Sequence, residues 1–525
     1  MSAHIDTFVR DNLPPRELWP ELKFTLPELQ HAAPYNASAI LDQAIAKGFG
    51  DNVAIYSAEG TTTYRQLLGQ VNLIADFLVN QAFVAGSRVL LHSINSRLAF
   101  AVWWGVIRAG GVAVATMPML RAKELEAIID KARISLAIAD DALLGEVLGA
   151  QLDSDVLEQA IPVSDLEYWL AQTAPCHFSP LPTAADDPAL IAFTSGTTGK
   201  PKGCVHFHRD IAAMAETFSR RVLQPKPTDV FCGTPPFAFT FGLGAAVVFP
   251  AAAGAATAIP DKPGFDVLAD TIAKHNATTL FTSPTGYRAL MKQDLGKLAS
   301  LHTCVSAGEH LPRATSDQWY ERTGIRIIDG IGSTEMIHIF VSARGDDIRP
   351  GATGKAVPGY EATLLNDNDE PFDGEGEGRL AIKGPTGCRY LADDRQKNYV
   401  VGGWNVTGDI YRRDADGYFW YISRADDMII SSGYNIGAPE VENALLTYDA
   451  VSECAVIGVP DAERGQIVKA FVVLKPGVEI SERALQDHVK QTIAPYKYPR
   501  AIEFVGELPK THTGKLQRFK LRETP

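Results

Sequence analysis

Short apolar runs alternate with longer amphipathic segments along the first part of the chain, and each kind predicts a different element. Runs of three or four apolar residues that indicate buried strands lie at 89–91, 112–115 and 136–139. Segments with apolar side chains at helical spacing lie between them, at 97–109 and 122–132. The same alternation returns with strands at 279–282, 303–306 and 325–328. This order predicts a mainly parallel sheet covered by helices, in which ligands bind beyond the carboxyl ends of the strands.

The pattern changes from about residue 366, where turn sequences separate short strands. Asp, Asn, Glu, Gly and Pro residues form such turns at 366–371 and 373–376, so we expect a β-rich subdomain over about residues 350–421. Beyond a boundary at 424–427 the sequence predicts helices at 439–446 and 482–493 and strands at 454–459 and 469–474. The predicted fold class is therefore α/β. A large N-terminal domain (residues 1–425) has mainly parallel sheets covered by helices, and a small C-terminal domain (residues 426–525) is α+β.

Residues 230–260 carry no charged side chain and are long enough to suggest a membrane span. Four prolines interrupt the segment, at Pro235, Pro236, Pro250 and Pro260. Because proline removes a backbone donor and breaks helices, we expect a buried strand–helix–strand unit near a substrate pocket and no membrane helix.

Composition and charge limit the classes of partner that the protein can bind. The 525 residues have a formal net charge of −13, which argues against a nucleic-acid or membrane-surface binder, because both need a basic surface. An anionic ligand must therefore meet local positive charge. Five cations lie close together near the end of the chain, at Lys510, Lys515, Arg518, Lys520 and Arg522. Ligand contact and a solvated basic tail explain this cluster equally well.

The six cysteines are scattered, with no Cys-x-x-Cys pair and no zinc-type spacing. This distribution is typical of free thiols in a reducing compartment, and it excludes a disulfide framework. Residues 1–15 show no basic region followed by an apolar core, so we expect no signal peptide and a cytoplasmic protein.

The densest chemical signal is the loop that follows the apolar run 190–193. It consists of Thr194, Ser195, Gly196, Thr197, Thr198, Gly199, Lys200, Pro201, Lys202 and Gly203. Glycine permits close backbone approach, hydroxyls and amides donate to phosphate oxygens, and lysine supplies charge. The spacing differs from that of a Walker loop. A flexible surface turn is the alternative, but the density of phosphate-binding groups favours a nucleotide.

A second glycine-rich segment follows the strand predicted at 325–328. It consists of Gly330, Ile331, Gly332, Ser333, Thr334 and Glu335. Its glycines permit close approach of a ligand, and Glu335 offers a hard oxygen suited to Mg²⁺. A helix N-terminus with an acid in its first turn explains the same residues equally well.

Together with four further motifs, these two loops resemble those of the class I adenylate-forming enzymes. This superfamily includes acyl-CoA and aryl-CoA ligases, luciferases and the adenylation domains of peptide synthetases. The further motifs follow the family's order at residues 306–309, 404–409, 423–436 and 509–515. Alone, each of these would be explained by a turn, an interdomain loop or an exposed tail, but together the motifs extend the resemblance over nearly the whole chain.

The resemblance implies an ATP site and assigns its residues. Those that would bind ATP or AMP are Thr194, Ser195, Gly196, Thr197, Thr198, Gly199, Lys202, Gly308, Glu309, Asp329, Gly330, Ile331, Asp409 and Arg424. Thr334 would contact the α-phosphate, Glu335 would bind Mg²⁺, and Lys515 would be the catalytic lysine. Asp409 would hold the ribose. Ile331 stands where the family usually has an aromatic residue stacked on adenine.

The resemblance also implies two half-reactions. A carboxylate attacks the α-phosphate of ATP to give acyl-AMP and pyrophosphate, and a thiol then attacks the acyl carbon and expels AMP. Asp426 would be the hinge of a mobile C-terminal domain. Gly433 and Tyr434 would line the tunnel for coenzyme A. Lys515→Ala should then abolish acyl-AMP formation and spare thioester formation, and Gly433→Leu should do the reverse.

Phenylalanines beside small residues predict a flat, apolar acyl pocket suited to an aromatic ring. Its predicted lining is Phe237, Ala238, Phe239, Ile331, Gly332 and His338. Core packing explains any single aromatic equally well, and a packing or surface role explains His338 equally well. Segments at 329–340 and 495–500 resemble the benzoate-CoA ligase branch, and those at 4–15 and 117–124 resemble 2-aminobenzoate-CoA ligases.

We therefore expect an ATP-dependent aryl-CoA ligase that uses Mg²⁺ and coenzyme A and acts on a small aromatic carboxylic acid of the benzoate or 2-aminobenzoate type. Two alternatives stay open: an acyl-AMP-forming enzyme that loads a carrier protein in trans, and a CoA ligase for a non-aromatic acid. A nucleotide-binding protein without turnover is disfavoured, because Glu335, Asp409 and Lys515 are all present. The sequence leaves a homodimer open.

Overall fold

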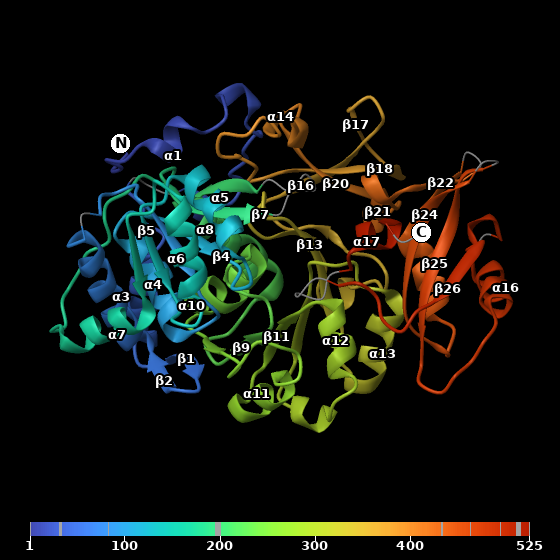
Figure 1. The fold of residues 1–525 in the computed structure, drawn as a ribbon, viewed down its shortest axis with the longest axis horizontal. Helices are drawn as coiled ribbons and strands as arrows, with labels where there is room; N and C mark the ends of the chain where they lie inside the picture. The colour runs from blue at the N-terminus through green and yellow to red at the C-terminus, as the bar shows by residue number, and fades with distance from the viewer. Residues whose placement is uncertain are drawn as a thin grey trace.

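Two sheets of mainly parallel strands carry the first part of the chain (Figure 1). The computed structural model describes residues 2–30, 34–81, 83–194, 201–431, 434–461, 464–493, 495–510 and 516–523. The smaller sheet contains, in spatial order, β6 (Gln159–Pro162), β5 (Leu136–Ala139), β3 (Arg88–His92), β4 (Val112–Thr116), β7 (Pro188–Thr194) and β8 (Lys202–Phe207). Its neighbours are parallel except for β7 and β8.

Helices cover this sheet, and the apolar pattern explains their positions. They are α3 (Tyr64–Val79), α4 (Arg97–Arg108), α5 (Ala122–Ala132), α6 (Leu144–Asp153) and α7 (Val163–Gln172). Strands β3 and β4 are buried at every position, as expected of parallel strands covered on both faces. The predicted bounds of α5 are confirmed, and α4 ends one residue earlier than predicted. Its N-terminus is fixed by the Ser96 hydroxyl, which accepts a hydrogen bond from the Ala99 N–H at 3.1 Å.

The larger sheet contains, in spatial order, β15 (Lys355–Ala356), β14 (Ile339–Ser342), β13 (Ile327–Gly332), β12 (Thr303–Ser306), β11 (Thr279–Thr282), β9 (Val230–Gly233), β10 (Ala256–Ala258), β1 (Val53–Ser57) and β2 (Gly60–Thr63). Neighbours from β13 to β1 are parallel, and antiparallel strands form both edges. The strand predicted at 325–328 continues through Gly332. Pairing with β14 extends it, because Gly330, Ile331 and Gly332 lie opposite Ser342, Val341 and Ile339.

The uncharged segment 230–260 forms the buried strand–helix–strand unit that its prolines predict. Strand β9 leads into α9 (Thr240–Leu243), η5 (Gly244–Val248) and α10 (Phe249–Ala253), and the chain returns through β10. Pro250 lies in the first turn of α10, where no backbone donor is needed. Within the described ranges, no helix is both long enough and apolar enough to cross a membrane.

Two antiparallel sheets follow. The first contains β17 (Pro371–Phe372), β16 (Glu361–Leu365), β18 (Gly376–Lys383), β20 (Trp404–Arg413) and β19 (Val400–Val401), with β21 (Phe419–Arg424) paired to β20. It lies in the stretch where the turn sequences predict a β-rich subdomain. The second contains β23 (Tyr434–Ile436), β22 (Ile429–Ser431), β25 (Gly465–Leu474) and β24 (Val451–Asp461), with β26 (Ala501–Phe504) parallel to β25.

Three helices complete the C-terminal unit: α15 (Ala438–Leu446), α16 (Glu482–Thr492) and α17 (Arg518–Glu523). Figure 1 shows β24, β25 and α16 at the opposite end of the molecule from β5 and α3. Helix α15 contacts the N-terminal part, since the Asn443 side-chain nitrogen lies 3.3 Å from His310 Nε2. The predicted fold class, a large N-terminal domain of helix-covered sheets with a smaller α+β C-terminal domain, is confirmed.

Candidate active site

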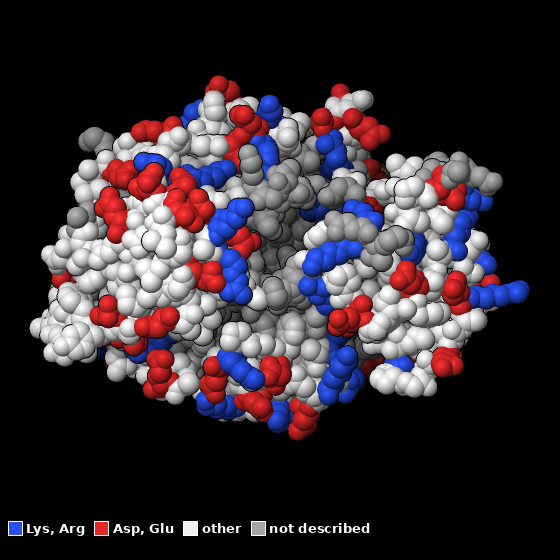
Figure 2. All heavy atoms as spheres, viewed as in Figure 1, with Lys and Arg blue, Asp and Glu red and all other residues white. Residues whose placement is uncertain are grey.

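A cleft of about 510 Å³ lies where the C-terminal unit faces β12, β13 and β20. We call it the interdomain cleft. Its N-terminal side is lined by Gly308, Glu309, Asp329, Gly330, Ile331, Asp409, Tyr421 and Arg424, and its C-terminal side by Glu442, Asn443, Lys510 and Arg518, among others. Figure 2 shows the molecule hollowed near the middle of one face, with Lys and Arg side chains along both sides of the hollow. The cleft thus brings four cations together with several acids, and its cations are Arg288, Arg424, Lys510 and Arg518.

A second cavity, of about 370 Å³, lies within the N-terminal part. We call it the apolar cavity, and its lining includes Met117, Met119, Pro236, Phe239, Phe241 and His338. Gly308, Glu309 and Gly332 line both the apolar cavity and the interdomain cleft. The two spaces therefore adjoin at the carboxyl ends of β12 and β13.

Seven of the residues predicted to bind ATP line the interdomain cleft: Gly308, Glu309, Asp329, Gly330, Ile331, Asp409 and Arg424. They come from four separate motifs, so the fold brings together residues that are more than a hundred positions apart in the sequence. Thr194 ends β7 and Lys202 begins β8. Five other predicted residues of this loop, Ser195, Gly196, Thr197, Thr198 and Gly199, lie outside the described residues, as do Gly433 and Lys515.

The predicted hinge and tunnel residues are described only in part. Asp426 belongs to the short turn η8 (Ala425–Asp427) between β21 and β22, and its side chain lies outside the described part. Tyr434 begins β23, and its side chain is 55% exposed. Its ring packs on that of Tyr496 with centroids 4.6 Å apart.

Asp409 occupies a buried position on β20, directly opposite Arg424 of β21. The Arg424 Nη1 lies 3.4 Å from Asp409 Oδ1. Gly408 precedes it with a φ of +77°, a backbone conformation that side chains other than glycine rarely adopt. The chain thus presents a carboxylate to the cleft beside a cation.

Asp329 is a second acid of the cleft, and its environment is different. It lies on β13, and the part of the chain that the structure describes gives its Oδ1 no hydrogen-bond partner. Burial raises the pKa of this carboxyl from 3.8 to about 8, because desolvation penalises the charged form. A buried oxygen without a partner costs free energy unless a ligand supplies one, so Asp329 marks a place where a ligand can hydrogen-bond.

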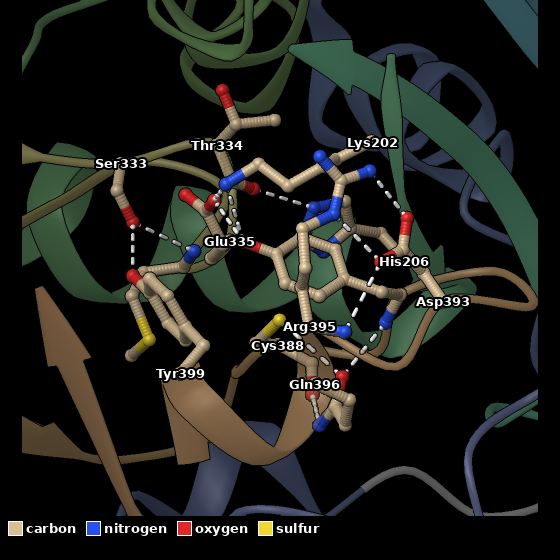
Figure 3. Close-up of polar contacts among 12 residues, drawn as sticks. Lys202, His206, Ser333, Thr334, Glu335, Cys388, Asp393, Arg395, Gln396 and Tyr399 are labelled. Carbon is tan, nitrogen blue, oxygen red and sulfur yellow. Dashed lines mark hydrogen bonds and ion pairs between the residues drawn. The ribbon is translucent and has the colours of Figure 1, made fainter. Parts of the chain in front are cut away.

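Glu335 lies at the centre of a polar cluster behind the cleft (Figure 3). Its Oε1 accepts a hydrogen bond from Tyr390 Oη at 2.6 Å and lies 3.7 Å from Lys202 Nζ. His206 Nε2 lies 2.7 Å from the backbone oxygen of Thr334; since a carbonyl only accepts, this nitrogen donates. The contacts connect strand β8 to the segment that carries Thr334 and Glu335.

The donor set around Glu335 fits a magnesium ion that is shared with a phosphate ligand. Searching the described residues finds no group of three or more acidic, His or Cys side chains able to hold a metal alone. Mg²⁺ commonly binds through one or two carboxylates and completes its shell with substrate phosphates and water. Glu335, with the adjacent Thr334 hydroxyl, provides a site of this kind.

The apolar cavity corrects part of the predicted acyl pocket. Phe239, Gly332 and His338 line it, but Phe237 is 1% exposed and packs edge-on against Phe100, with centroids 5.6 Å apart. The Phe237 N–H donates to Asn95 Oδ1 at 2.8 Å, which holds this residue against the core.

Two further predicted lining residues lie elsewhere. Ala238 packs against the core, and Ile331 lines the interdomain cleft. Met117 and Met119, from the loop after β4, were not among the residues predicted to line the pocket, although that loop follows the carboxyl end of a parallel strand. Phe237 and Ala238 are therefore not among the residues that line the apolar cavity, and Ile331 lines the neighbouring cleft.

His338 is one of the residues that line the apolar cavity. Its ring packs against Phe218, Phe241 and Phe249, with centroid distances of 5.2, 5.8 and 4.6 Å. Burial lowers its pKa from 6.5 to about 3, so the ring is neutral near pH 7. The preceding Ile337 has a φ of +66°, which is rare for a β-branched residue. Such strain is typical of functional sites, where the surrounding structure holds an unfavourable conformation.

Comparison with known proteins identifies relatives over nearly the whole chain. Residues 42–390 match the AMP-binding enzyme family, and residues 440–515 match the AMP-binding enzyme C-terminal domain. A benzoate–CoA ligase of Thauera aromatica is 35% identical over 515 residues, which cover 95% of this chain and 98% of the relative.

Solved structures agree with this match. The crystal structure of the anthranilate CoA ligase AuaEII in complex with anthranoyl-AMP has a TM-score of 0.90 and 34% identity, covering 95% of this chain and 98% of the other. A benzoate CoA ligase from Burkholderia xenovorans LB400 has a TM-score of 0.85 and 32% identity, covering 93% of this chain and 100% of the other.

Proposed function

Because the chain belongs to the AMP-binding enzyme family, we propose that it is an ATP-dependent aryl-CoA ligase. It activates a small aromatic carboxylic acid of the benzoate or 2-aminobenzoate type as the acyl-AMP, with release of pyrophosphate, and transfers the acyl group to coenzyme A. The benzoate and anthranilate CoA ligases among its relatives support the substrate class.

One observation carries the proposal: the apolar cavity opens into the interdomain cleft at Gly308, Glu309 and Gly332. An aromatic acid in the cavity would direct its carboxylate toward this junction, because the charged group cannot be buried among Phe239, Phe241 and His338 without a large desolvation cost. A nucleotide in the cleft would bring its α-phosphate to the same place. The two reacting groups meet without either ligand leaving its site.

In the first half-reaction, we assign the residues of the cleft to binding and charge stabilisation. Asp409 accepts hydrogen bonds from the ribose hydroxyls, and Asp329 hydrogen-bonds the base or ribose. Carboxylate and triphosphate together concentrate negative charge, so positive charge must already be in place. Lys202 and Lys515 supply part of it. Glu335 would hold Mg²⁺, which neutralises the phosphate oxygens when it is bound.

In the second half-reaction, the C-terminal domain turns about Asp426 and exposes a path for coenzyme A past Gly433 and Tyr434. In the present orientation, the cleft is closed on one side by Lys510 and Arg518. Arg518 is held by two hydrogen bonds from its Nη2 to the Glu442 carboxylate, at 2.7 and 2.9 Å. This arrangement suits the adenylation step, because it keeps cations over the nucleotide and water out.

The test is AMP release in the presence of ATP and Mg²⁺, with and without coenzyme A, across benzoate, 2-aminobenzoate, hydroxybenzoates and straight-chain acids. We expect turnover that requires coenzyme A and is confined to aryl acids. Turnover of alkyl acids would contradict the assigned acid. Acyl-AMP formation without any response to coenzyme A would contradict the assigned acceptor and favour a carrier protein in trans.

A further inference from the structure

The Tyr390 hydroxyl lies between Lys202 and Glu335, which the proposed function assigns to ATP and Mg²⁺. We propose that Tyr390 is a positioning residue, whose hydroxyl fixes one oxygen of the Glu335 carboxylate and leaves the other directed to the magnesium ion. The inference rests on the proposed function only in that Glu335 binds the metal. Nothing in the motifs around residue 390 predicts this contact from the sequence.

The chemistry of the three groups fixes the direction of each hydrogen bond. Lys202 Nζ lies 3.1 Å from Tyr390 Oη, and an ammonium group only donates. The Tyr390 oxygen therefore accepts from Lys202, and its own proton points to Glu335 Oε1 at 2.6 Å. A hydrogen bond to an ionised acceptor is short and about twice as strong as a neutral one.

Both nearby donors use the same carboxylate oxygen. Tyr390 and Lys202 approach Glu335 Oε1, and within the described ranges no hydrogen bond reaches Oε2. Glu335 is 8% exposed, and a buried carboxylate needs hydrogen-bond donors to offset its desolvation. Fixing Oε1 selects one orientation and leaves Oε2 available as a single metal ligand, as Mg²⁺ bound to phosphates requires.

The main chain around Tyr390 is held on two sides, by Gln396 and by β8, so the hydroxyl has a fixed position. The Tyr390 N–H donates to Gln396 Oε1 at 2.9 Å, and Gln396 Nε2 donates to the Cys388 oxygen at 3.0 Å. On the other side the segment pairs with β8, where the Val205 N–H donates to the Arg389 oxygen at 2.9 Å. Lys202 is the first residue of β8, and Tyr390 lies on the segment that pairs with β8. This pairing therefore positions both donors to Glu335.

Tyr399 provides a matched control within the same cluster. Its ring meets that of Tyr390 edge-on, with centroids 6.0 Å apart, and its hydroxyl lies 3.2 Å from Ser333 Oγ (Figure 3). Each tyrosine thus contacts the Ser333–Glu335 segment through one hydroxyl, but only Tyr390 contacts the metal carboxylate. Tyr390→Phe and Tyr399→Phe remove the same atom from similar surroundings.

The experiment measures the dissociation constant of ATP by calorimetry, without any acid present, in magnesium chloride and in EDTA. Magnesium should tighten ATP binding to the wild-type protein. Tyr390→Phe should reduce this magnesium-dependent gain roughly tenfold, as loss of an outer partner of a metal ligand does. Binding in EDTA should change less than about twofold, since the Tyr390 hydroxyl acts on the nucleotide only through Glu335 and the metal.

Three comparisons decide the outcome. Tyr399→Phe should keep the wild-type response to magnesium, and in a Glu335→Gln background Tyr390→Phe should have no further effect. Equal losses in both phenylalanine variants, or a full loss from Tyr390→Phe on top of Glu335→Gln, would overturn the positioning role alone. A wild-type protein that binds ATP equally in both buffers would overturn the metal role of Glu335 in the proposed function. Thermal unfolding of each variant checks that the fold is intact.

Discussion

The interdomain cleft and the apolar cavity adjoin, yet they are built by opposite means. The cleft is lined by charged and polar side chains from both the N-terminal part and the C-terminal unit, among them Asp329, Asp409 and Arg518. The apolar cavity is lined within the N-terminal part by Phe239, Phe241 and His338, among others. Polar recognition of a shared co-substrate needs fixed charges at fixed positions, whereas an apolar pocket needs only volume and shape. This difference suggests that the two sites can be changed independently.

The pKa values of one titratable group in each site shift in opposite directions. Burial raises the pKa of Asp329 in the cleft to about 8 and lowers that of His338 in the cavity to about 3. Desolvation favours the neutral form in both cases. Near pH 7 both side chains are therefore mainly neutral, so neither adds a full charge to the space that it lines.

The largest expected effect comes from Glu335→Gln on the cleft side. The variant loses the anionic metal ligand, so we expect the rate of acyl-AMP formation to fall on the order of a hundredfold to a thousandfold. The loss should be the same factor for every acid, because Glu335 does not contact the ring. Pyrophosphate exchange across several aryl acids measures it. A loss that differed strongly between acids would contradict the separation of the two sites.

Asp409→Asn should have a smaller effect, also confined to the nucleotide. Replacing the charged acceptor of the ribose hydroxyls weakens ATP binding by roughly tenfold to a hundredfold, given the strength of hydrogen bonds to charged groups. The KM for ATP should rise, while the KM for the acid at saturating ATP stays unchanged. Initial rates with each substrate varied in turn provide the check, and a parallel rise in both KM values would be evidence against the assignment.

Phe239→Ala tests the cavity side. Removing the ring enlarges the apolar space, so we expect the ratio of kcat/KM values between benzoate and acids with larger ring substituents to shift about tenfold toward the larger acids. The KM for ATP should stay at its wild-type value. Competition between paired acids measures the ratio directly. An unchanged ratio would show that the acid binds elsewhere.

The remaining predictions concern stability and not activity, and the pH dependence has opposite signs in the two sites. His338 has a lowered pKa, so the unfolded chain takes up a proton that the native protein does not, and stability falls as pH decreases below 6.5. Between pH 6.5 and 4.5, the wild-type protein should therefore lose about 2 to 3 kcal/mol of its free energy of unfolding through His338, and His338→Phe should remove this loss.

Asp329 has a raised pKa, so its contribution to the free energy of unfolding falls as pH rises from 3.8 toward 8, and Asp329→Asn should remove that loss. Urea unfolding at several pH values separates the contributions of His338 and Asp329. If both variants changed the slope of the free energy of unfolding against pH in the same direction, the burial of one of the two groups would be contradicted.

The sequence predicted the cleft better than the cavity, and the reason is physical. Cleft residues such as Asp329 and Asp409 lie beside glycines in short sequence motifs whose chemistry is local and whose order along the chain is distinctive. Cavity residues are ordinary apolar side chains, and whether Phe237 or Phe239 faces the cavity depends on packing against Phe100 of a distant helix. Local patterns do not contain that information.

Helices and strands were likewise predicted well where their bounds depend on local sequence and less well where they depend on distant contacts. Helix α5 was predicted with its exact bounds because its amphipathic period and its end at Ala132 are local features. Strand β13 begins two residues and ends four residues later than predicted, and its last three residues become a strand only by pairing with β14. The contact between Tyr390 and Glu335 joins residues 55 positions apart, and no motif at residue 390 signals it.

The most direct test of the account combines the two sites in one measurement. Pyrophosphate exchange is measured for wild type, Glu335→Gln and Phe239→Ala against the same set of aryl and alkyl acids. The account predicts that Glu335→Gln lowers all rates by one factor and keeps the order of acids, whereas Phe239→Ala changes the order and leaves the dependence on ATP unaltered. A change of order in Glu335→Gln, or a changed ATP dependence in Phe239→Ala, would contradict a ligase whose nucleotide cleft and acid cavity act as separate sites.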